Sequence, residues 1–254
     1  MEFATLTMAD WASILAGALA FVFGGILKGA TGAGAPVVIV PVIALLFDVP
    51  TAVVLFAIPN LLTNIWQGWS CRDAQVPGAF PWLFATGGFL GALTGTIILA
   101  SAAPDNLSVV MAAVVFVYVG FRLARPEWRL HHAVARWLVL PAGLIAGVLQ
   151  GSTGISAPVS VTFINAMRLQ RRSFMAVMSV FFLSLACAQI PLMVWFGLMD
   201  HRLGLLGLLA VLPMVAGMPL GALLGKRIPA PVFDRVILLL LTVIAMKLVS
   251  EQFL

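Results

Sequence analysis

The stretch Gly25-Ile-Leu-Lys-Gly-Ala-Thr-Gly-Ala-Gly-Ala-Pro36 recurs 122 positions later as Gly147-Val-Leu-Gln-Gly-Ser-Thr-Gly-Ile-Ser-Ala-Pro158. Each copy places small residues and a proline inside an otherwise apolar stretch, so each copy is expected to break a helix. The spacing is close to half of the 254-residue chain, which indicates an internal duplication. In a membrane protein, a helix break that occurs in both halves points to a ligand-binding site where the halves meet.

The composition is that of an integral membrane protein. The chain is 62% hydrophobic and 9% charged, whereas a soluble domain carries about 25% charged residues. Its length leaves room for about eight to ten membrane segments of ~20 residues. Cys71 and Cys187 form no metal-binding motif, so we expect no metal, no cofactor and no disulfide. The net charge of +5 is better explained by orientation in a membrane than by nucleic-acid binding.

The apolar segments form two groups separated by a polar stretch. They fall at about 11–30, 36–47, 51–69, 80–100 and 105–121, and again at about 137–152, 157–167, 173–197, 203–223 and 231–249. We therefore predict an all-α polytopic membrane protein with two repeats, 1–121 and 137–254, joined by a cytoplasmic basic linker at 122–136. Residues 87–95 and 217–225 are also similar, and their Gly-xxx-Gly runs favour close packing of transmembrane helices.

The lysines and arginines predict the orientation. If each break forms a hairpin that returns to the side it entered, all but three of the 14 lysines and arginines share one face. Arg202 and Lys247 lie on the opposite face, and Lys28 lies inside the membrane. The positive-inside rule then makes the rich face cytoplasmic and puts both termini outside, in the inner membrane of a bacterium. The halves begin on opposite sides, so the repeats are expected to be inverted.

The second arm of each hairpin is short. As a helix, residues 36–47 span ~18 Å, against a hydrocarbon core of ~30 Å, so both breaks are expected near the membrane midplane. Pro36 and Pro158 suit the first turn of a helix, where a missing N–H does no harm. The amides around Gly34 and Ser156 should then be free, and two facing helix N-termini would favour an anion.

Lys28 strengthens the case for an anionic ligand. An ionisable residue inside an apolar segment is a functional-site candidate, and the alternative is a lysine that snorkels to the surface. Its counterpart in the second copy, Gln150, is uncharged. Two interpretations are open for the other polar residues of the apolar segments: they line a central cavity, or they form hydrogen bonds between helices. The candidate substrate-binding residues are Lys28, Thr31, Gly32, Gly34, Ala35, Asn60, Asn64, Gln67, Gln150, Ser152, Thr153, Gly154, Ser156, Ala157 and Gln189.

At these residues the chain resembles the TauE/SafE sulfite exporter family, also called the 4-toluene sulfonate uptake permeases. The resemblance rests on the size, the doubled glycine-rich break and the Pro-Val run that follows it at Pro36 and Pro158. It implies a membrane carrier for sulfite, thiosulfate, sulfonates or other organosulfur anions. Members often have a run of glycines after the break, whereas this chain reads Gly32-Ala-Gly34-Ala-Pro36, which leaves the particular anion open.

The leading hypothesis is a secondary carrier for a small sulfur-containing anion that works by alternating access. An anion channel and a carrier of a non-sulfur organic anion are the alternatives. A membrane enzyme is disfavoured because no His, Asp and Glu constellation lies in the apolar segments. An inside-negative potential favours anion exit by about 2.3 kcal/mol per charge per 100 mV. Import would need a coupling ion such as the proton, and direction, coupling and oligomeric state stay open.

Overall fold

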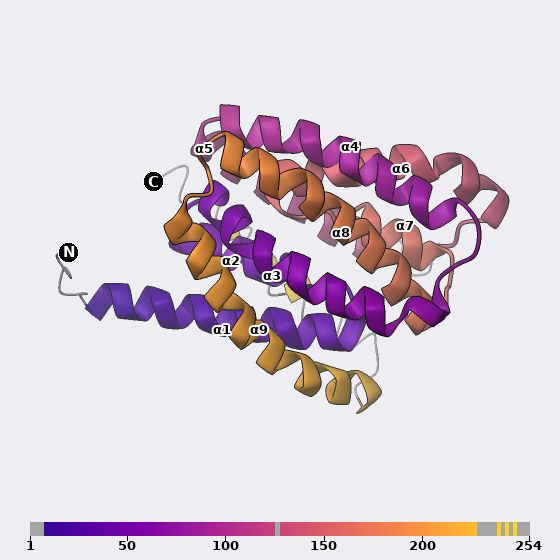
Figure 1. The fold of residues 1–254 in the computed structure, drawn as a ribbon, viewed down its shortest axis with the longest axis horizontal. Coiled ribbons are helices and arrows are strands. Elements are labelled where there is room, and N and C mark those ends of the chain that lie inside the picture. The colour runs from indigo at the N-terminus through magenta and orange to yellow at the C-terminus, as the bar shows by residue number, and fades with distance from the viewer. Residues whose placement is uncertain (1–7, 125–127, 228–237, 240–241, 244–245, 248–254) are drawn as a thin grey trace.

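The computed structural model describes residues 8–124, 128–227, 238–239, 242–243 and 246–247. Across these residues it is helical, with one short 3-10 turn, η1 (Arg72–Ala74), and no strand. Figure 1 shows the long helices running roughly along the long axis of a single bundle. In chain order the helices are α1 (Met8–Thr31), α2 (Ala35–Leu46), α3 (Val49–Ser70), α4 (Phe80–Ser101), α5 (Pro104–Ala124), α6 (His132–Thr153), α7 (Ser160–Ala166), α8 (Arg171–Trp195) and α9 (His201–Arg227).

Seven of the described helices, α1, α3, α4, α5, α6, α8 and α9, are long and apolar enough to cross a membrane. This confirms the predicted all-α polytopic class. The short second arms correspond to α2, with 12 residues, and α7, with 7 residues. The predicted segment at 231–249 lies mostly outside the described residues.

The two arms of the first hairpin, α1 and α2, differ in length. α1 has 24 residues, which is ~36 Å of helix, so its first arm is long enough to cross a bilayer by itself. α2 packs back against α1 and ends at Leu46. The chain then turns at once, because the Asp48 carboxylate accepts a hydrogen bond from the Thr51 N–H at 2.6 Å and caps α3. The depth of the break in the membrane stays a prediction.

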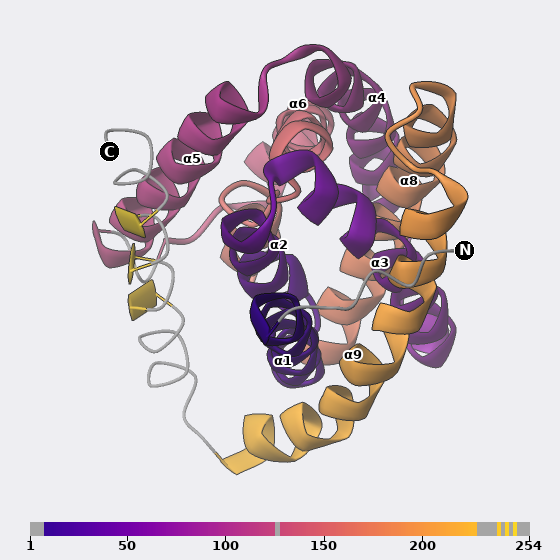
Figure 2. The same ribbon diagram turned by 90° about the vertical axis from the view of Figure 1, so that its left-hand side faces the viewer.

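Two helix pairs form the flanks of the bundle, and two central helices join them. α1 packs along α9, and α4 packs along α6. α3 contacts both α8 and α9, and α8 contacts α4, so α3 and α8 bridge the flanks. Figure 2 shows α2 in the interior of the bundle, where most of its residues are buried, with α5 at the edge. Each flank therefore combines a helix of the first half with a helix of the second half.

Glycines set the distance between α1 and α9. A Cβ at Gly25 or Gly29 would collide with the backbone of α9 at Met214 and Met218. In return, a Cβ at Gly221 would collide with the backbone of α1. Backbones in such close contact gain van der Waals packing that larger residues would prevent.

The α4–α6 pair repeats this contact. Gly91 of α4 meets the backbone of α6, and Gly147 and Gly151 of α6 meet the backbone of α4. In both pairs the helices run parallel, since contacting positions increase together along the chain. The expectation that the Gly-xxx-Gly patches pack helices is confirmed. Gly147 and Gly151, like Gly25 and Gly29, therefore pack helices and are not part of the breaks.

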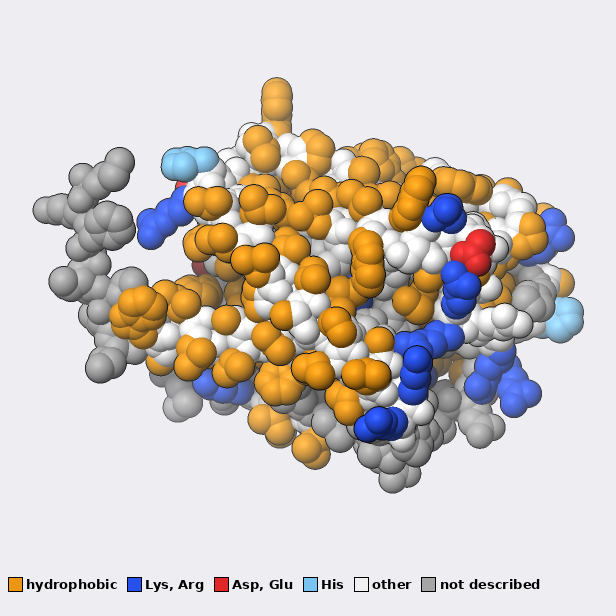
Figure 3. All heavy atoms as spheres, turned by 60° about the horizontal axis from the view of Figure 1, so that its bottom comes forward, with side chains coloured by type: hydrophobic (Ala, Val, Ile, Leu, Met, Phe, Trp, Pro, Cys, Tyr) orange, Lys and Arg blue, Asp and Glu red, His pale blue; other side chains and the backbone are white. Residues whose placement is uncertain are grey.

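The surface consists of apolar sides and one basic end. Figure 3 shows hydrophobic side chains along the bundle and lysines and arginines gathered at the end where α3 ends and α8 begins. We call this end the basic end. Its described basic residues include Arg72, Arg129, Arg136, Arg168, Arg171, Arg172, Lys226 and Arg227.

The glycine contacts predict a difference between two Gly→Ala variants of α9. Gly221→Ala puts a methyl group into the backbone of α1 at Ile26, and overpacking of this kind costs about 1–3 kcal/mol. Gly204→Ala meets no atom within 4 Å and should be neutral or slightly stabilising. Thermal unfolding in detergent should therefore show a lower Tm for Gly221→Ala alone. Equal Tm values for the two variants would contradict the proposed packing role.

Candidate functional site

The first break lies between α1 and α2 and is closed by one threonine. Gly32 has a φ of +91°, a left-handed conformation that favours glycine. The Thr31 hydroxyl donates to the Leu27 carbonyl at 2.8 Å and accepts from the Gly34 N–H at 3.1 Å. Pro36 lies in the first turn of α2, as predicted. The expectation that the Gly34 amide is free is wrong, because the Thr31 hydroxyl satisfies it.

The second break has the same threonine but a different exit. Gly154 has a φ of +73°, and the Thr153 hydroxyl donates to the Leu149 carbonyl at 2.8 Å. The Ser156 N–H donates to Gln150 Oε1 at 3.1 Å, so this amide is not free either.

The helix after the second break begins later than expected. α7 starts at Ser160, so the prediction that Pro158 opens this helix is wrong. The Val159 and Ser160 N–H groups both donate to the Ser156 carbonyl, at 3.0 and 2.8 Å, and close a turn over residues 156–159. The Ser160 hydroxyl supports this turn, since it lies 2.9 and 3.1 Å from the carbonyl and hydroxyl oxygens of Ser156. With seven residues, α7 is too short to supply the expected second helix dipole. Of the two helix N-termini expected after the breaks, the described residues therefore keep one of full helical length, that of α2.

Lys28 belongs to a buried polar cluster. Its side chain is 2% exposed, and its Nζ donates to Asn64 Oδ1 at 2.8 Å. Asn64 Nδ2 donates to the carbonyl and Oδ1 of Asn60, each at 2.7 Å. The Lys28 Nζ also lies 5.9 Å from the centre of the Phe182 ring. α1, α3 and α8 thus meet at an ionisable group, and Lys28 is a buried residue that does not snorkel.

Two glutamines tie the central helices to the rest of the site. Gln67 Nε2 donates to the Gly32 carbonyl at 2.8 Å and to the Ser179 hydroxyl at 2.9 Å, linking α3, the first break and α8. Gln189 Nε2 lies 3.4 Å from the Gln150 carbonyl, a weaker contact between α8 and α6. The matched positions of the two halves therefore carry related but unequal contacts.

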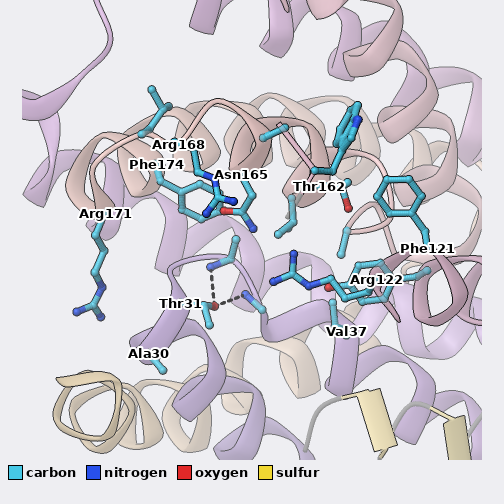
Figure 4. A pocket seen from close by; sticks show the side chains of 18 of the residues that line it. Ala30, Thr31, Val37, Phe121, Arg122, Thr162, Asn165, Arg168, Arg171 and Phe174 are labelled. Atoms are coloured by element: carbon cyan, nitrogen blue, oxygen red, sulfur yellow. Dashed lines mark hydrogen bonds between the residues drawn. The ribbon is translucent and has the colours of Figure 1, made fainter. Parts of the chain in front are cut away.

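A cavity of about 480 Å³ opens at the basic end and is bordered by residues of both duplicated motifs. Thr31 and Gly34 of the first break and Ala157 of the second line it. Figure 4 shows Arg122 and Arg168 extending into this space, and the Thr31 hydroxyl at its wall. Among the described residues that line the cavity none is acidic, so its electrostatic character is positive.

The remaining lining supplies hydrogen-bonding and aromatic groups. Thr162 and Asn165 come from α7, one turn apart, and Arg171 opens α8. Arg171 Nη2 donates to the Gly29 carbonyl at 2.8 Å, which fixes the end of α1 against α8. The aromatic rings come from Tyr118, Phe121, Trp128 and Phe174.

The cavity contains only part of the predicted site. Of the candidates it is lined by Thr31, Gly34 and Ala157. Lys28, Asn60 and Asn64 form the buried cluster between α1 and α3, and Gln67 bonds the first break and α8 instead. All four lie outside the cavity wall. The candidates that also lie outside the wall are Gly32, Ala35, Gln150, Ser152, Thr153, Gly154, Ser156 and Gln189.

The sequence analysis missed the cavity arginines. Arg122, Arg168 and Arg171 served there only as markers of membrane orientation. These arginines lie just outside apolar segments and close to a break. This position was the available signal, because residues at such places border any cavity that opens at that end of the bundle. Thr162 and Asn165, spaced i and i+3 in a short helix, carried a second signal.

The fold and the cavity define a class: a multi-pass membrane protein with a positively charged cavity among its helices. The comparison with protein families specifies it. The family model described as sulfite exporter TauE/SafE matches residues 17–248, so the chain belongs to that family of membrane transporters. The family supports an anionic small molecule as substrate and a lipid environment. A search of curated proteins and a search of solved structures returned no match.

The Lys28–Asn64 hydrogen bond predicts a non-additive pair of substitutions. Asn64→Leu leaves the buried Lys28 Nζ without this acceptor, which costs about 1–3 kcal/mol of unfolding free energy. Lys28→Met removes the donor instead. The double variant should lose less than the sum of the two single losses, because Lys28 and its acceptor are then removed together, whereas the contact of Asn64 with Asn60 is lost equally in the single and the double variant. The free energy of unfolding of the two single variants and the double variant is measured in mixed micelles. Strictly additive losses would show that the two side chains do not interact.

Proposed function

We propose that the protein is a secondary carrier that takes up a small sulfur-containing anion from the cavity at the basic end. The observation that carries this proposal is one cavity lined by residues of both duplicated motifs together with Arg122, Arg168 and Arg171. Guanidinium groups present fixed N–H donors that match the oxygens of sulfite, thiosulfate and sulfonates. The α2 N-terminus adds a partial positive charge at the wall formed by Gly34.

The size of the cavity bears on the choice of anion. A space of about 480 Å³ lies within the range of small-molecule sites and exceeds the volume of a three-oxygen anion alone. Aromatic rings such as Phe121, Trp128 and Phe174 line the same space. Sulfonates with an organic group therefore fit the lining as well as inorganic sulfite does, and both belong in a flux assay.

The closed opposite end supports alternating access. At the offset of 122, the positions Thr162, Asn165 and Arg168 correspond to Val40, Ile43 and Leu46 in the first half. Val40 is 0% and Ile43 is 2% exposed, within the main apolar cluster, and Leu46 packs against it. The cavity is thus open at one end, and apolar packing fills the matching place at the other end. A carrier with inverted halves would exchange these two arrangements.

The difference between the polar cavity residues and their apolar counterparts in the first half also supports export. The positive-inside rule makes the basic end cytoplasmic, with both termini outside and the protein in the inner membrane. Arginine residues then attract the anion on the cytoplasmic side, and apolar counterparts favour its release on the other side. The membrane potential drives an anion outward by about 2.3 kcal/mol per charge per 100 mV. Export on this basis needs no coupling ion.

Arg168→Gln tests the cavity as the loading site. Losing one charge-assisted contact to the anion should reduce flux into proteoliposomes about tenfold, equivalent to ~1.4 kcal/mol. Arg202→Gln removes the same charge at the far end, where α9 begins, and serves as the matched control. Flux of sulfite, thiosulfate and an aromatic sulfonate is measured for each. Equal flux by Arg168→Gln and the control would reject this loading site.

Cysteine accessibility tests alternating access. In a Cys71→Ala, Cys187→Ala background, Thr162→Cys should react with a membrane-impermeant thiol reagent added at the basic end. Val40→Cys should be protected in this state, since Val40 is fully buried, and should react from the opposite side when the anion is cycling. Simultaneous reaction of each position from both sides would indicate an anion channel instead.

A further inference from the structure

A second cavity, of about 720 Å³, also lies at the basic end. Its walls come from the segment before α4, the first turns of α4 and α6, and the loop between α7 and α8. Most of the lining is apolar, including Val76, Phe80, Leu83 and Met167. It contains one charged side chain among the described residues, Arg136. This combination differs from the first cavity, in which several basic and polar groups are gathered.

The placement of the charged residue suggests an amphipathic ligand. Arg136 and Trp137 lie side by side in the first turns of α6, both exposed, and the Trp137 side chain is 87% exposed. Tryptophan is enriched where the headgroups meet the hydrocarbon core, so this end of the cavity lies at headgroup level. The apolar wall formed by Phe80 and Leu83 belongs to α4, a helix that crosses the membrane.

We propose that this second cavity binds an anionic phospholipid. The Arg136 guanidinium pairs with the lipid phosphate, Trp137 packs beside the headgroup, and an acyl chain covers the apolar wall. Basic pockets between transmembrane helices on the cytoplasmic side bind anionic headgroups in this way. A free phosphate would leave the apolar wall uncovered, and a zwitterionic lipid carries no net charge for Arg136.

The loop between α7 and α8 connects the lipid site to the first cavity. Met167 and Leu169 line the second cavity, Arg168 lines the first, and Leu169 lines both. Arg168 has a φ of +53°, a left-handed conformation that is unusual for a residue with a side chain. A lipid that packs against Met167 and Leu169 therefore supports the backbone that points Arg168 at the transported anion. This consequence rests on the proposed function, whereas lipid binding itself does not.

Native mass spectrometry of the purified full-length protein tests the binding site. Phosphatidylglycerol and phosphatidylcholine with identical acyl chains are compared, with soluble glycerol phosphate as a third probe. We expect Arg136→Gln to weaken phosphatidylglycerol binding about tenfold and Ala133→Trp, which fills the cavity, to weaken it as well. Arg129→Gln removes an exposed charge of the same end outside the cavity and should bind like the wild type.

Three results would overturn the site. They are unchanged phosphatidylglycerol binding by Arg136→Gln, equal binding of the two lipids by the wild type, and glycerol phosphate binding as tight as that of the lipid. None depends on transport, so failure of the proposed function is seen separately as absent anion flux. In phosphatidylglycerol vesicles, flux by Arg136→Gln should fall at least about threefold below that of Arg129→Gln. Equal flux by these two variants would overturn the link through Arg168.

Discussion

Close backbone contact at glycine is the constraint on which the bundle depends. On one flank Gly25 and Gly29 bring α1 against α9, and on the other Gly147 and Gly151 bring α6 against α4. Both contacts join helices from different halves of the chain. Because the breaks follow directly after α1 and α6, holding these helices in place also positions the breaks, and residues of both border one cavity.

The two copies of the motif have the same backbone geometry at the break but differ in the contacts of their polar side chains. Both have a threonine that bonds the last turn of the helix and a left-handed glycine after it. Lys28 in one copy forms a buried cluster with asparagines, whereas Gln150 in the other satisfies a loop amide. α2 is a 12-residue helix, and α7 is little more than a turn. The cavity that they border therefore has two different walls.

The sequence predicted the helical class, the positions of most segments and the glycine packing, because apolar length and small-residue spacing are local properties. It did not predict the exit from the second break, since the Ser156–Ser160 hydrogen bonds form only in the folded turn. It also missed Arg168 as a lining residue. Whether an arginine near a helix end faces water or a cavity depends on which helices pack around it, and α7, α8 and the first break are far apart in sequence.

The pairing of α1 with α9 has a consequence during synthesis. α1 ends at Thr31 and its partner begins at His201, about 170 residues later. At the usual rate of translation, α1 waits about 10 to 30 seconds before the surface that covers Gly25 and Gly29 exists. Over the same interval Lys28 depends on α3, which supplies Asn64 early in the chain. The α1–α9 contact can therefore form only after α9 has been made, and a chain stopped before α9 would leave the glycine face of α1 uncovered.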